Sequence, residues 1–414
     1  MGNTPNIRFI GFTDDWEQRK LGELSSSFEY GLNAAAKEYD GENKYIRITD
    51  IDDDSREFKQ EDITSPDTDL SSAENYRLSE GDILLARTGA SVGKSYIYKA
   101  SDGLVYYAGF LIRARIKPEY NSEFVFQNTL TGDYEKFIKV TSMRSGQPGV
   151  NAQEYSQYQI MVPSKPEQDK ISDCLRNLDN LITLHQRKCD EMKKMKKFML
   201  QKMFPKNGQK NPEIRFDGFT DDWEQRKLGD YLQVSSEKNR DNRFTKDDVL
   251  SVSGEYGIVN QIEFQGRSFA GASVSNYGVV ETGDVVYTKS PLKSNPYGII
   301  KTNKGIPGIV STLYAVYRPK EITDSKFVQI YFELDSRMNS YMHPLVNKGA
   351  KNDMKVSAEN ALKGMVSFPQ KDEQKRISSY FDTLDHLITL HQRKYKLLRK
   401  IKKYMLQRMF LRHK

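Results

Sequence analysis

The sequence IRFIGFTDDWEQRKLG at residues 7–22 occurs again as IRFDGFTDDWEQRKLG at residues 214–229. Only Ile10 and Asp217 differ, so 15 of 16 positions match at an offset of 207 residues. A match of this length indicates that the 414-residue chain contains two copies of one unit. We therefore expect a tandem duplication, with one fold present twice.

A second repeat marks the other end of each copy. The octapeptide LITLHQRK occurs at residues 181–188 and again, unchanged, at 387–394, an offset of 206 residues. Between the repeated ends, residues 23–160 and 230–366 share little identity beyond pieces such as the Gly-Asp of EGDILLA and TGDVVYT. This pattern suggests one scaffold that presents two different recognition surfaces.

The repeats divide the chain into two variable domains, each followed by a long helix. We place the first domain at 1–165 and its helix at 166–204, the second domain at 205–370 and its helix at 371–414. Short β-rich runs alternate with Gly, Asp and Asn, which is typical of a mixed α/β fold. The expected strands are 45–51, 82–87, 95–98, 110–116, 249–252, 284–288 and 312–317, and the expected helices are 123–130 and 326–334.

Both long helices carry apolar residues at heptad positions a and d, kept over about five heptads, which favours a coiled coil. We expect the helices to pair with each other in antiparallel orientation, with His185 and His391 near a pseudo-twofold axis. These histidines are interpreted as packing residues, because no carboxylate or cysteine joins them at metal-ligand spacing. Further apolar residues, including Leu175, Ile182 and Cys189, fill position e. The predicted seam is Ile171, Leu178, Leu181, His185 and Met192 on the first helix, and Ile377, Leu384, Leu387, His391 and Leu398 on the second.

The composition excludes several classes of protein. Cys174 and Cys189 are the only cysteines, too few for a disulfide framework or a cysteine-based zinc site, so we expect a reducing compartment. No apolar run approaches the ~18 residues of a membrane span. The first residues, MGNTPNIRF, lack the apolar region of a signal peptide. A cytoplasmic protein without membrane spans is therefore expected.

The net charge of +7 is unevenly distributed along the chain. Residues 1–165 contain 19 Lys and Arg against 26 Asp and Glu, a net charge of −7, whereas residues 371–414 contain 13 against 4, a net charge of +9. The basic last helix is interpreted as a solvated face or a partner-binding surface. The net charge alone therefore does not predict a nucleic-acid groove.

Three segments resemble parts of enzyme sites, and each fails on spacing or context. Gly89–Ser95 resembles a phosphate-binding loop, but three residues instead of four separate its glycines and a strand is expected to follow. We interpret Asn295–Tyr297 as a turn, because it has one proline and no preceding cofactor loop. Asp372–Lys375 opens a helix, where acidic side chains complement the helix dipole. We predict no catalytic residue and no metal site.

The layout resembles the specificity subunit of Type I restriction–modification systems. The resemblance covers essentially the whole chain. It rests on the paired FTDDWEQRKLG segments, on Glu167-Gln168 and Glu373-Gln374 ahead of the long helices, and on GDILLARTG at 81–89. It implies two target recognition domains, each reading one half of a bipartite, gapped sequence in double-stranded DNA. The helices would set the spacing between the halves and dock the modification subunits.

The resemblance also implies where the chemistry takes place. Two modification subunits would methylate adenine with S-adenosylmethionine, and restriction subunits would use ATP and Mg to translocate and cut DNA. This chain would bind no cofactor of its own, which agrees with the lack of a catalytic motif.

DNA contacts are expected from polar and basic side chains in glycine-containing loops, because Arg pairs with guanine and Asn or Gln with adenine. Trp16 and Trp223 are expected to act in folding or docking, because a duplicated element cannot encode two different half-sites. The predicted contacts are Arg87, Thr88, Lys94, Arg144, Ser145, Gln147 and Asn151 in the first domain, and Lys289, Lys293, Asn295, Lys348, Lys351 and Asn352 in the second.

Two alternatives stay open at the level of sequence. One is a scaffold or adaptor whose two domains bind proteins, with the coiled coil as a spacer. The other is an enzyme that uses the loop at Gly89, in which case the chain alone would turn over nucleotide and Lys94→Ala would abolish that turnover. We predict no turnover.

Overall fold

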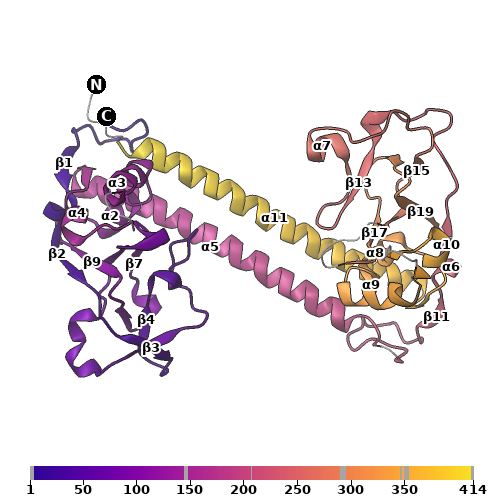
Figure 1. Cartoon of the computed structure of the whole chain (residues 1–414), viewed down its shortest axis with the longest axis horizontal. Helices are drawn as coiled ribbons and strands as arrows, with labels where there is room; N and C mark the ends of the chain where they lie inside the picture. The colour runs from indigo at the N-terminus through magenta and orange to yellow at the C-terminus, as the bar shows by residue number, and fades with distance from the viewer. Residues whose placement is uncertain are drawn as a thin grey trace. The chain divides into compact units, whose positions relative to one another are not determined.

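The computed structural model describes residues 4–143, 148–206, 208–289, 295–345, 347–348 and 354–411. The chain divides into two compact units, one formed by residues 1–187 with 391–414 and the other by residues 188–390. Two long helices, α5 (Lys165–Lys202) and α11 (Lys371–Met409), contribute to both units. Each unit therefore contains one variable domain and part of each long helix (Figure 1).

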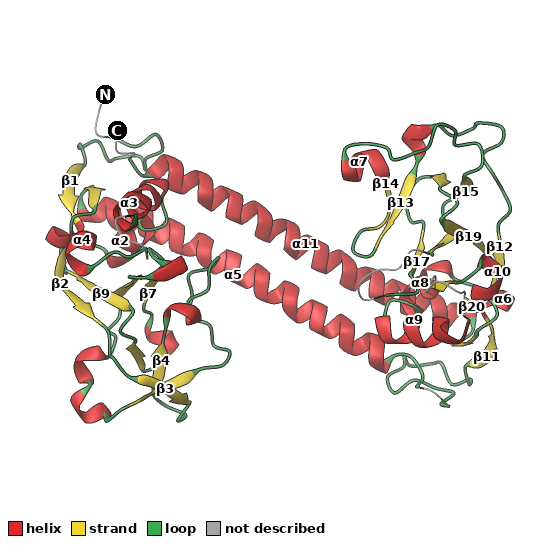
Figure 2. Cartoon of the chain, viewed as in Figure 1, coloured by secondary structure: helices red, strands yellow, loops and turns green. Residues whose placement is uncertain are grey.

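Strands dominate the first variable domain, and short helices flank them (Figure 2). Its strands are β1 (Glu17–Lys20), β2 (Ser25–Tyr30), β3 (Ala35–Glu38), β4 (Lys44–Ile46), β5 (Thr64–Asp67), β6 (Ile83–Ala86), β7 (Ser95–Ile97), β8 (Val105–Tyr107), β9 (Leu111–Ile116) and β10 (Gln159–Val162). Its helices are α1 (Leu21–Leu24), α2 (Ser122–Asn128), α3 (Gly132–Ser142) and α4 (Ala152–Ser156). The central antiparallel sheet has the order β2-β9-β6-β7, and β1 pairs with β10 in a separate sheet. Two further pairs, β3-β5 and β4-β8, complete the domain.

The second variable domain repeats this plan. Its strands are β11 (Glu224–Lys227), β12 (Leu232–Val234), β13 (Leu250–Ser253), β14 (Gly257–Asn260), β15 (Gly278–Val280), β16 (Val285–Thr288), β17 (Ile299–Thr302), β18 (Gly308–Val310), β19 (Tyr314–Pro319), β20 (Asn347–Lys348), β21 (Met354–Lys355) and β22 (Met365–Phe368). Its helices are α6 (Leu228–Tyr231), α7 (Gln261–Gln265), α8 (Ser325–Tyr331), α9 (Asp335–Met342) and α10 (Ala358–Ala361). The sheets β12-β19-β16-β17 and β11-β22 match β2-β9-β6-β7 and β1-β10. The predicted duplication of a mixed α/β fold is confirmed.

The two long helices pack against each other inside each unit. In the first unit the start of α5 meets the end of α11, where Leu175 and Leu406 share one core. In the second unit the end of α5 meets the start of α11, where Leu200 and Ile377 share another. Both contacts are antiparallel, as predicted. His185 and His391 lie in contact in the first unit, with 2.8 Å between their Nδ1 atoms.

The buried seam of the helix pair differs by one register from the predicted one. Leu181 was expected inside the seam, but its side chain is 44% exposed, whereas Cys189 is 2% exposed. The prediction for Leu181 is wrong because the apolar residues at position e face the other helix in place of those at d. Among the other predicted seam residues, Ile171 and Ile377 are buried, and Leu178, His185, Met192, Leu384, Leu387, His391 and Leu398 are half-buried.

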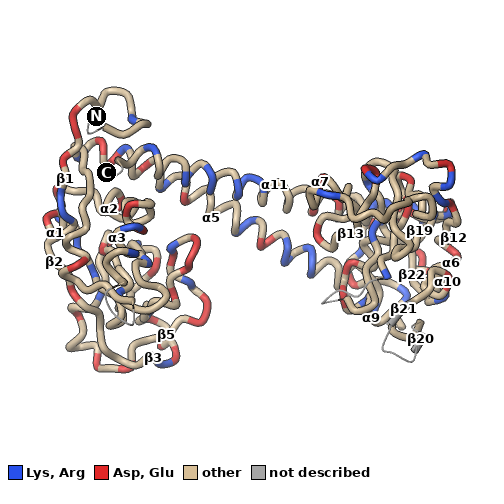
Figure 3. Tube along the Cα trace, turned by 45° about the horizontal axis from the view of Figure 1, so that its top comes forward, with Lys and Arg blue, Asp and Glu red and all other residues tan. Residues whose placement is uncertain are grey.

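Lys and Arg recur along both long helices (Figure 3), but not all of them are solvated. In the second unit Lys196 is mostly buried and forms ion pairs of 2.6 Å with both Glu333 and Asp385. Burial lowers the pKa of Lys196, but the two carboxylates outweigh burial and raise it above its ordinary value. Within the described residues, no helix combines the length and the apolar character needed to cross a bilayer.

Candidate nucleic-acid interface

The repeated segments build the same aromatic corner in each unit. Trp16 is 1% exposed and lies edge-on to Phe124 and Phe410, with ring centroids 5.9 and 6.5 Å away. Trp223 packs on Phe204 in the same way, at 6.0 Å. Both tryptophans are core residues, which agrees with the expected role in folding.

A buried ion pair joins the repeated segment to the long helix in each unit. Arg8 donates from Nε to Oε1 of Glu167 at 2.7 Å, and Arg215 does the same to Glu373 at 2.7 Å. The next residue of each helix is a glutamine that donates its amide to a proline carbonyl, as Gln168 does at 2.9 Å. The repeated Glu-Gln pairs therefore join the repeated segments and the long helices.

Arg87 is the predicted DNA-contact residue whose surroundings best fit that role. It follows β6 directly, and its guanidinium carbon lies 5.2 Å from the ring centroid of Tyr30 and 5.8 Å from that of Phe110. Tyr30 is 45% exposed and Phe110 is 60% exposed. We call Arg87, Tyr30 and Phe110 the Arg87 cluster. Thr88, beside the cluster, is half-buried and forms a β-bridge with Gly149.

Lys94 has a structural role instead. Its side chain is 7% exposed, donates to the carbonyl of Ile51 at 3.1 Å and forms an ion pair with Asp53 at 2.5 Å. Gly93 before it has a φ of +83°, and a Cβ there would lie 2.8 Å from Ile138, so the turn is held against α3. Strand β7 follows the turn, as expected, and not the helix that a phosphate-binding loop requires. In this placement the Lys94 ammonium is engaged by Asp53 and the carbonyl of Ile51.

Asn151 and Asn295 also serve the fold. Asn151 caps α4 by accepting a hydrogen bond from the backbone N–H of Glu154 at 2.9 Å. Asn295 is 5% exposed and donates from Nδ2 to Asp335 at 2.7 Å. The amide of Asn295 is therefore buried, whereas Asn151 is exposed and engages its Oδ1 in the cap.

The second domain places Lys289 where the first has Arg87. Lys289 follows β16, and its backbone N–H donates to the carbonyl of Leu313 at 3.3 Å; that of Arg87 donates to Phe110 at 3.1 Å. The predicted contacts Arg144, Ser145, Gln147, Lys293, Lys351 and Asn352 lie outside the described residues, and only the backbone of Lys348 is described.

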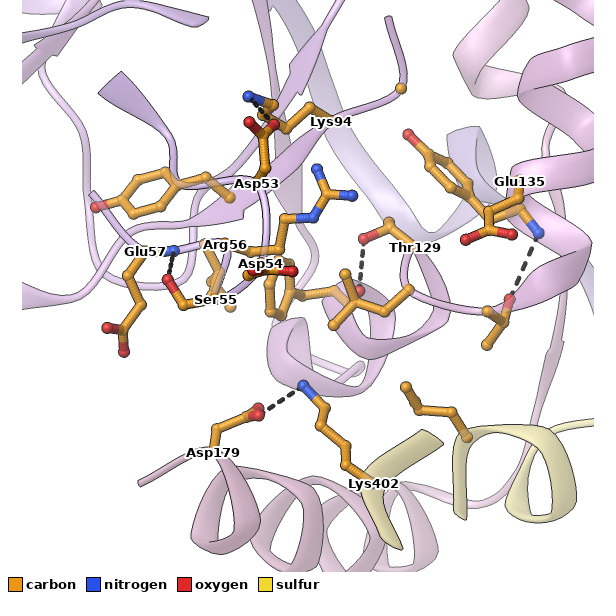
Figure 4. A pocket seen from close by; sticks show the side chains of 18 of the residues that line it. Asp53, Asp54, Ser55, Arg56, Glu57, Lys94, Thr129, Glu135, Asp179 and Lys402 are labelled. Carbon is orange, nitrogen blue, oxygen red and sulfur yellow. Dashed lines mark hydrogen bonds and ion pairs between the residues drawn. The ribbon is translucent and has the colours of Figure 1, made fainter. Parts of the chain in front are cut away.

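A cleft of about 1000 Å³ in the first unit lies between the variable domain and the long helices. Figure 4 shows acidic and basic side chains around it, with Asp53 beside Lys94 and Asp179 beside Lys402. Lys402 pairs with Asp179 at 2.6 Å, and Arg399 pairs with Asp54 at 2.8 Å. Because these cations already have acidic partners, the cleft offers a phosphate less free positive charge than its composition suggests. The Arg87 cluster is the better candidate for contact with DNA.

Arg87 could be predicted from the sequence as a DNA contact, whereas Tyr30 and Phe110 were missed. Both rings lie at ends of paired strands, and they meet Arg87 only once β2, β9 and β6 are neighbours. The sequence feature that could have indicated Phe110 was its position at the start of the predicted strand 110–116.

Comparison with protein families gives an independent result. The family model described as the Type I restriction modification DNA specificity domain matches residues 13–194 and 220–400. The chain belongs to this family. It is a specificity subunit of a Type I restriction–modification system, and the two matched segments correspond to the two copies of the duplication.

Similar proteins span nearly the whole specificity subunit. A relative assigned as the MjaX Type I restriction enzyme specificity subunit of Methanocaldococcus jannaschii is 23% identical over 431 residues, covering 94% of this chain and 91% of that protein. The MjaVIII specificity subunit of the same organism is 21% identical over 415 residues, covering 97% and 93%. The crystal structure of the S subunit from M. genitalium shares the fold, with a TM-score of 0.65 and 13% identity over 99% of this chain and 100% of that one.

In the described part of the specificity subunit, no group of three or more His, Cys, Asp or Glu side chains is arranged to hold a metal ion. Recognition is the function that the family match supports, and the adaptor alternative has no observation in its favour.

Proposed function

We propose that the two variable domains each read a different half of a gapped DNA sequence. The observation that carries this proposal is the contrast inside the duplication. Trp16, Arg8 and Glu167 have counterparts with the same contacts in the second unit, whereas Arg87 has Lys289 at its position. A shared scaffold with different side chains on its surface is what two different half-sites require.

The long helices serve as the spacer between the two readers. Each of the two contacts between α5 and α11 is built into the core of one unit. The lengths of these helices then set the number of unread base pairs between the half-sites. DNA readers on one duplex work at fixed spacings because the groove they face repeats with each helical turn.

The chemistry belongs to partner subunits. Two modification subunits transfer a methyl group from S-adenosylmethionine to adenine, and restriction subunits use ATP and Mg. This chain recognises the DNA sequence on which they act. Cys174 and Cys189 are free thiols, which suits a complex that works on DNA in the reducing cytoplasm.

Reconstitution tests the function. The chain is combined with modification subunits, and methylated adenines are mapped across a genome that lacks other methylation. We expect one gapped motif with two defined halves. Methylation without a motif, or a motif that is unchanged when the specificity subunit is omitted, would contradict the proposal.

Exposed apolar residues on the long helices mark the surface for the modification subunits. Met195 and Phe198 on α5 are 48% and 46% exposed, and Ile401 and Tyr404 at the same places in the repeat on α11 are 38% and 52% exposed. Apolar side chains left in water at repeated positions indicate a contact made twice. Two copies of one partner fit this arrangement.

Replacing Tyr404 by glutamate should weaken binding of the modification subunit about 10-fold or more, because a charge would have to be buried in the contact. Titration calorimetry with the purified modification subunit measures the effect. Val140→Glu, on the exposed face of α3, is the matched control, because Val140 is 68% exposed and lies away from the long helices in sequence. Equal affinities for the two variants would remove Tyr404 from the docking surface.

A further inference from the structure

Arg87 is held at the point where β6 leaves the central sheet. Its backbone N–H donates to the carbonyl of Phe110 at 3.1 Å, and its own carbonyl accepts from the N–H of Val150 at 2.9 Å. These two bonds fix the backbone from both sides. The side chain therefore starts from a rigid position.

Two aromatic rings hold the guanidinium. The guanidinium carbon lies 5.2 Å from the centroid of Tyr30 and 5.8 Å from that of Phe110, within the range of cation–π attraction. The hydroxyl of Tyr30 accepts from the backbone N–H of Ala152 at 3.2 Å, which fixes that ring. The plane of the guanidinium is thus oriented before any ligand arrives, which lowers the entropy lost on binding.

Arg87 has no acidic partner within the described residues, although the domain around it carries a net charge of −7. Its Nε has no hydrogen-bond partner there and is buried. Because Nε is buried, the two terminal nitrogens are the guanidinium donors left for a ligand. The arginines of the same domain that do pair with carboxylates are Arg8, Arg19, Arg47, Arg77, Arg113 and Arg115.

The second domain keeps the position and changes the residue. Ala86 pairs with Leu111 at the end of β6, and Thr288 pairs with Tyr314 at the end of β16, so the residues that follow, Arg87 and Lys289, are equivalent. The residues before the facing strands, Phe110 and Leu313, are each 60% exposed. A cation beside an exposed apolar residue is therefore common to both domains, and its identity differs between them.

We infer that Arg87 reads a guanine in the major groove of the first half-site, positioned by Tyr30 and Phe110. The inference rests on the proposed function. Two parallel N–H groups of a guanidinium match O6 and N7 of guanine, and no other base presents this pair of acceptors in the major groove. The exposed rings lie beside the same bases and exclude water from the contact.

The test uses the full chain reconstituted with modification subunits, with methylated adenines mapped for each variant. Arg87→Ala should lower the preference for guanine at one position of one half-site by about 10- to 100-fold and leave the other half and the spacer unchanged. Arg87→Gln should move that position from guanine towards adenine, which a glutamine amide pairs with. Lys289→Ala should leave that guanine unaffected, and Arg77→Ala, at a surface arginine paired with Glu74, should leave the whole motif unaffected.

The outcomes separate this inference from the function on which it rests. A wild-type chain that directs no gapped motif contradicts the function. A wild-type motif that Arg87→Ala leaves unchanged overturns the inference, including the case in which methylation falls equally at all sites, since that is the behaviour of a phosphate contact. A failure of Arg87→Ala to assemble is resolved by Arg87→Gln, which keeps a side chain between the rings.

Discussion

Replacing Phe410 by alanine is expected to destabilise the first variable domain by about 3–5 kcal/mol, although Phe410 lies at the opposite end of the sequence from that domain. The ring is 6% exposed and stacks on Phe124 at 5.4 Å between centroids. It also lies edge-on to Trp16 at 6.5 Å. Its removal leaves a cavity inside the core of the first unit, which relaxes only in part.

The second copy contains an equivalent phenylalanine, which packs in the second unit. Phe204 follows α5 and packs on Trp223 and Phe327 in the second unit, so Phe204→Ala should destabilise the second domain by a similar amount. Urea unfolding gives the change in free energy, and hydrogen exchange read peptide by peptide assigns it to one unit. Tyr404→Ala is the control, since Tyr404 is 52% exposed on α11, the helix that Phe410 follows. The contrary result would be faster hydrogen exchange in the second domain for Phe410→Ala, or in the first domain for Phe204→Ala. It would show that these rings do not pack in the cores that the structure gives them.

Glu167→Gln is expected to destabilise the first unit by about 3 kcal/mol. The glutamate is 1% exposed and accepts from both Nε and Nη2 of Arg8, at 2.7 and 2.8 Å. A glutamine fits the same space but has one accepting oxygen and no charge. The guanidinium would then stay mostly buried without its counter-ion, which is the costly part of breaking such a pair.

The duplication supplies an internal replicate for this prediction. Glu373→Gln breaks the equivalent pair with Arg215 and should destabilise the second unit by a similar free energy. Glu17→Gln is the control, because its pair with Arg19 lies at the surface, where solvent screens it, and should contribute little to stability. Similar small losses from Glu167→Gln and Glu17→Gln would mean that the buried pair does not fasten the scaffold.

The duplication and the long helices could be predicted because repeated segments and heptad patterns are properties of the local sequence. The matching segments gave the two copies, and the heptads gave the helices to within a few residues of α5 and α11. The register of the seam could not be settled in the same way. Apolar residues occupy both d and e, so the choice between Leu181 and Ile182 depends on which side the other helix approaches.

The roles of single polar residues depended on tertiary neighbours. Lys94 was expected at a DNA surface, yet Asp53 and the carbonyl of Ile51 hold it inside the domain. Lys196 stands in a run of lysines on α5, yet it lies against Glu333, which is 137 residues away in sequence. No periodicity reports such pairings. The two rings of the Arg87 cluster were missed for the same reason, because Tyr30 and Phe110 lie far apart in the chain.

The most direct test of the account exchanges residues 23–160 for the corresponding region of another specificity subunit and leaves both repeated segments and both long helices in place. Methylated adenines are then mapped after reconstitution with the same modification subunits. We expect one half of the motif to change while the other half and the spacing stay as they were. A motif that changes in both halves, or in neither with assembly intact, would contradict it.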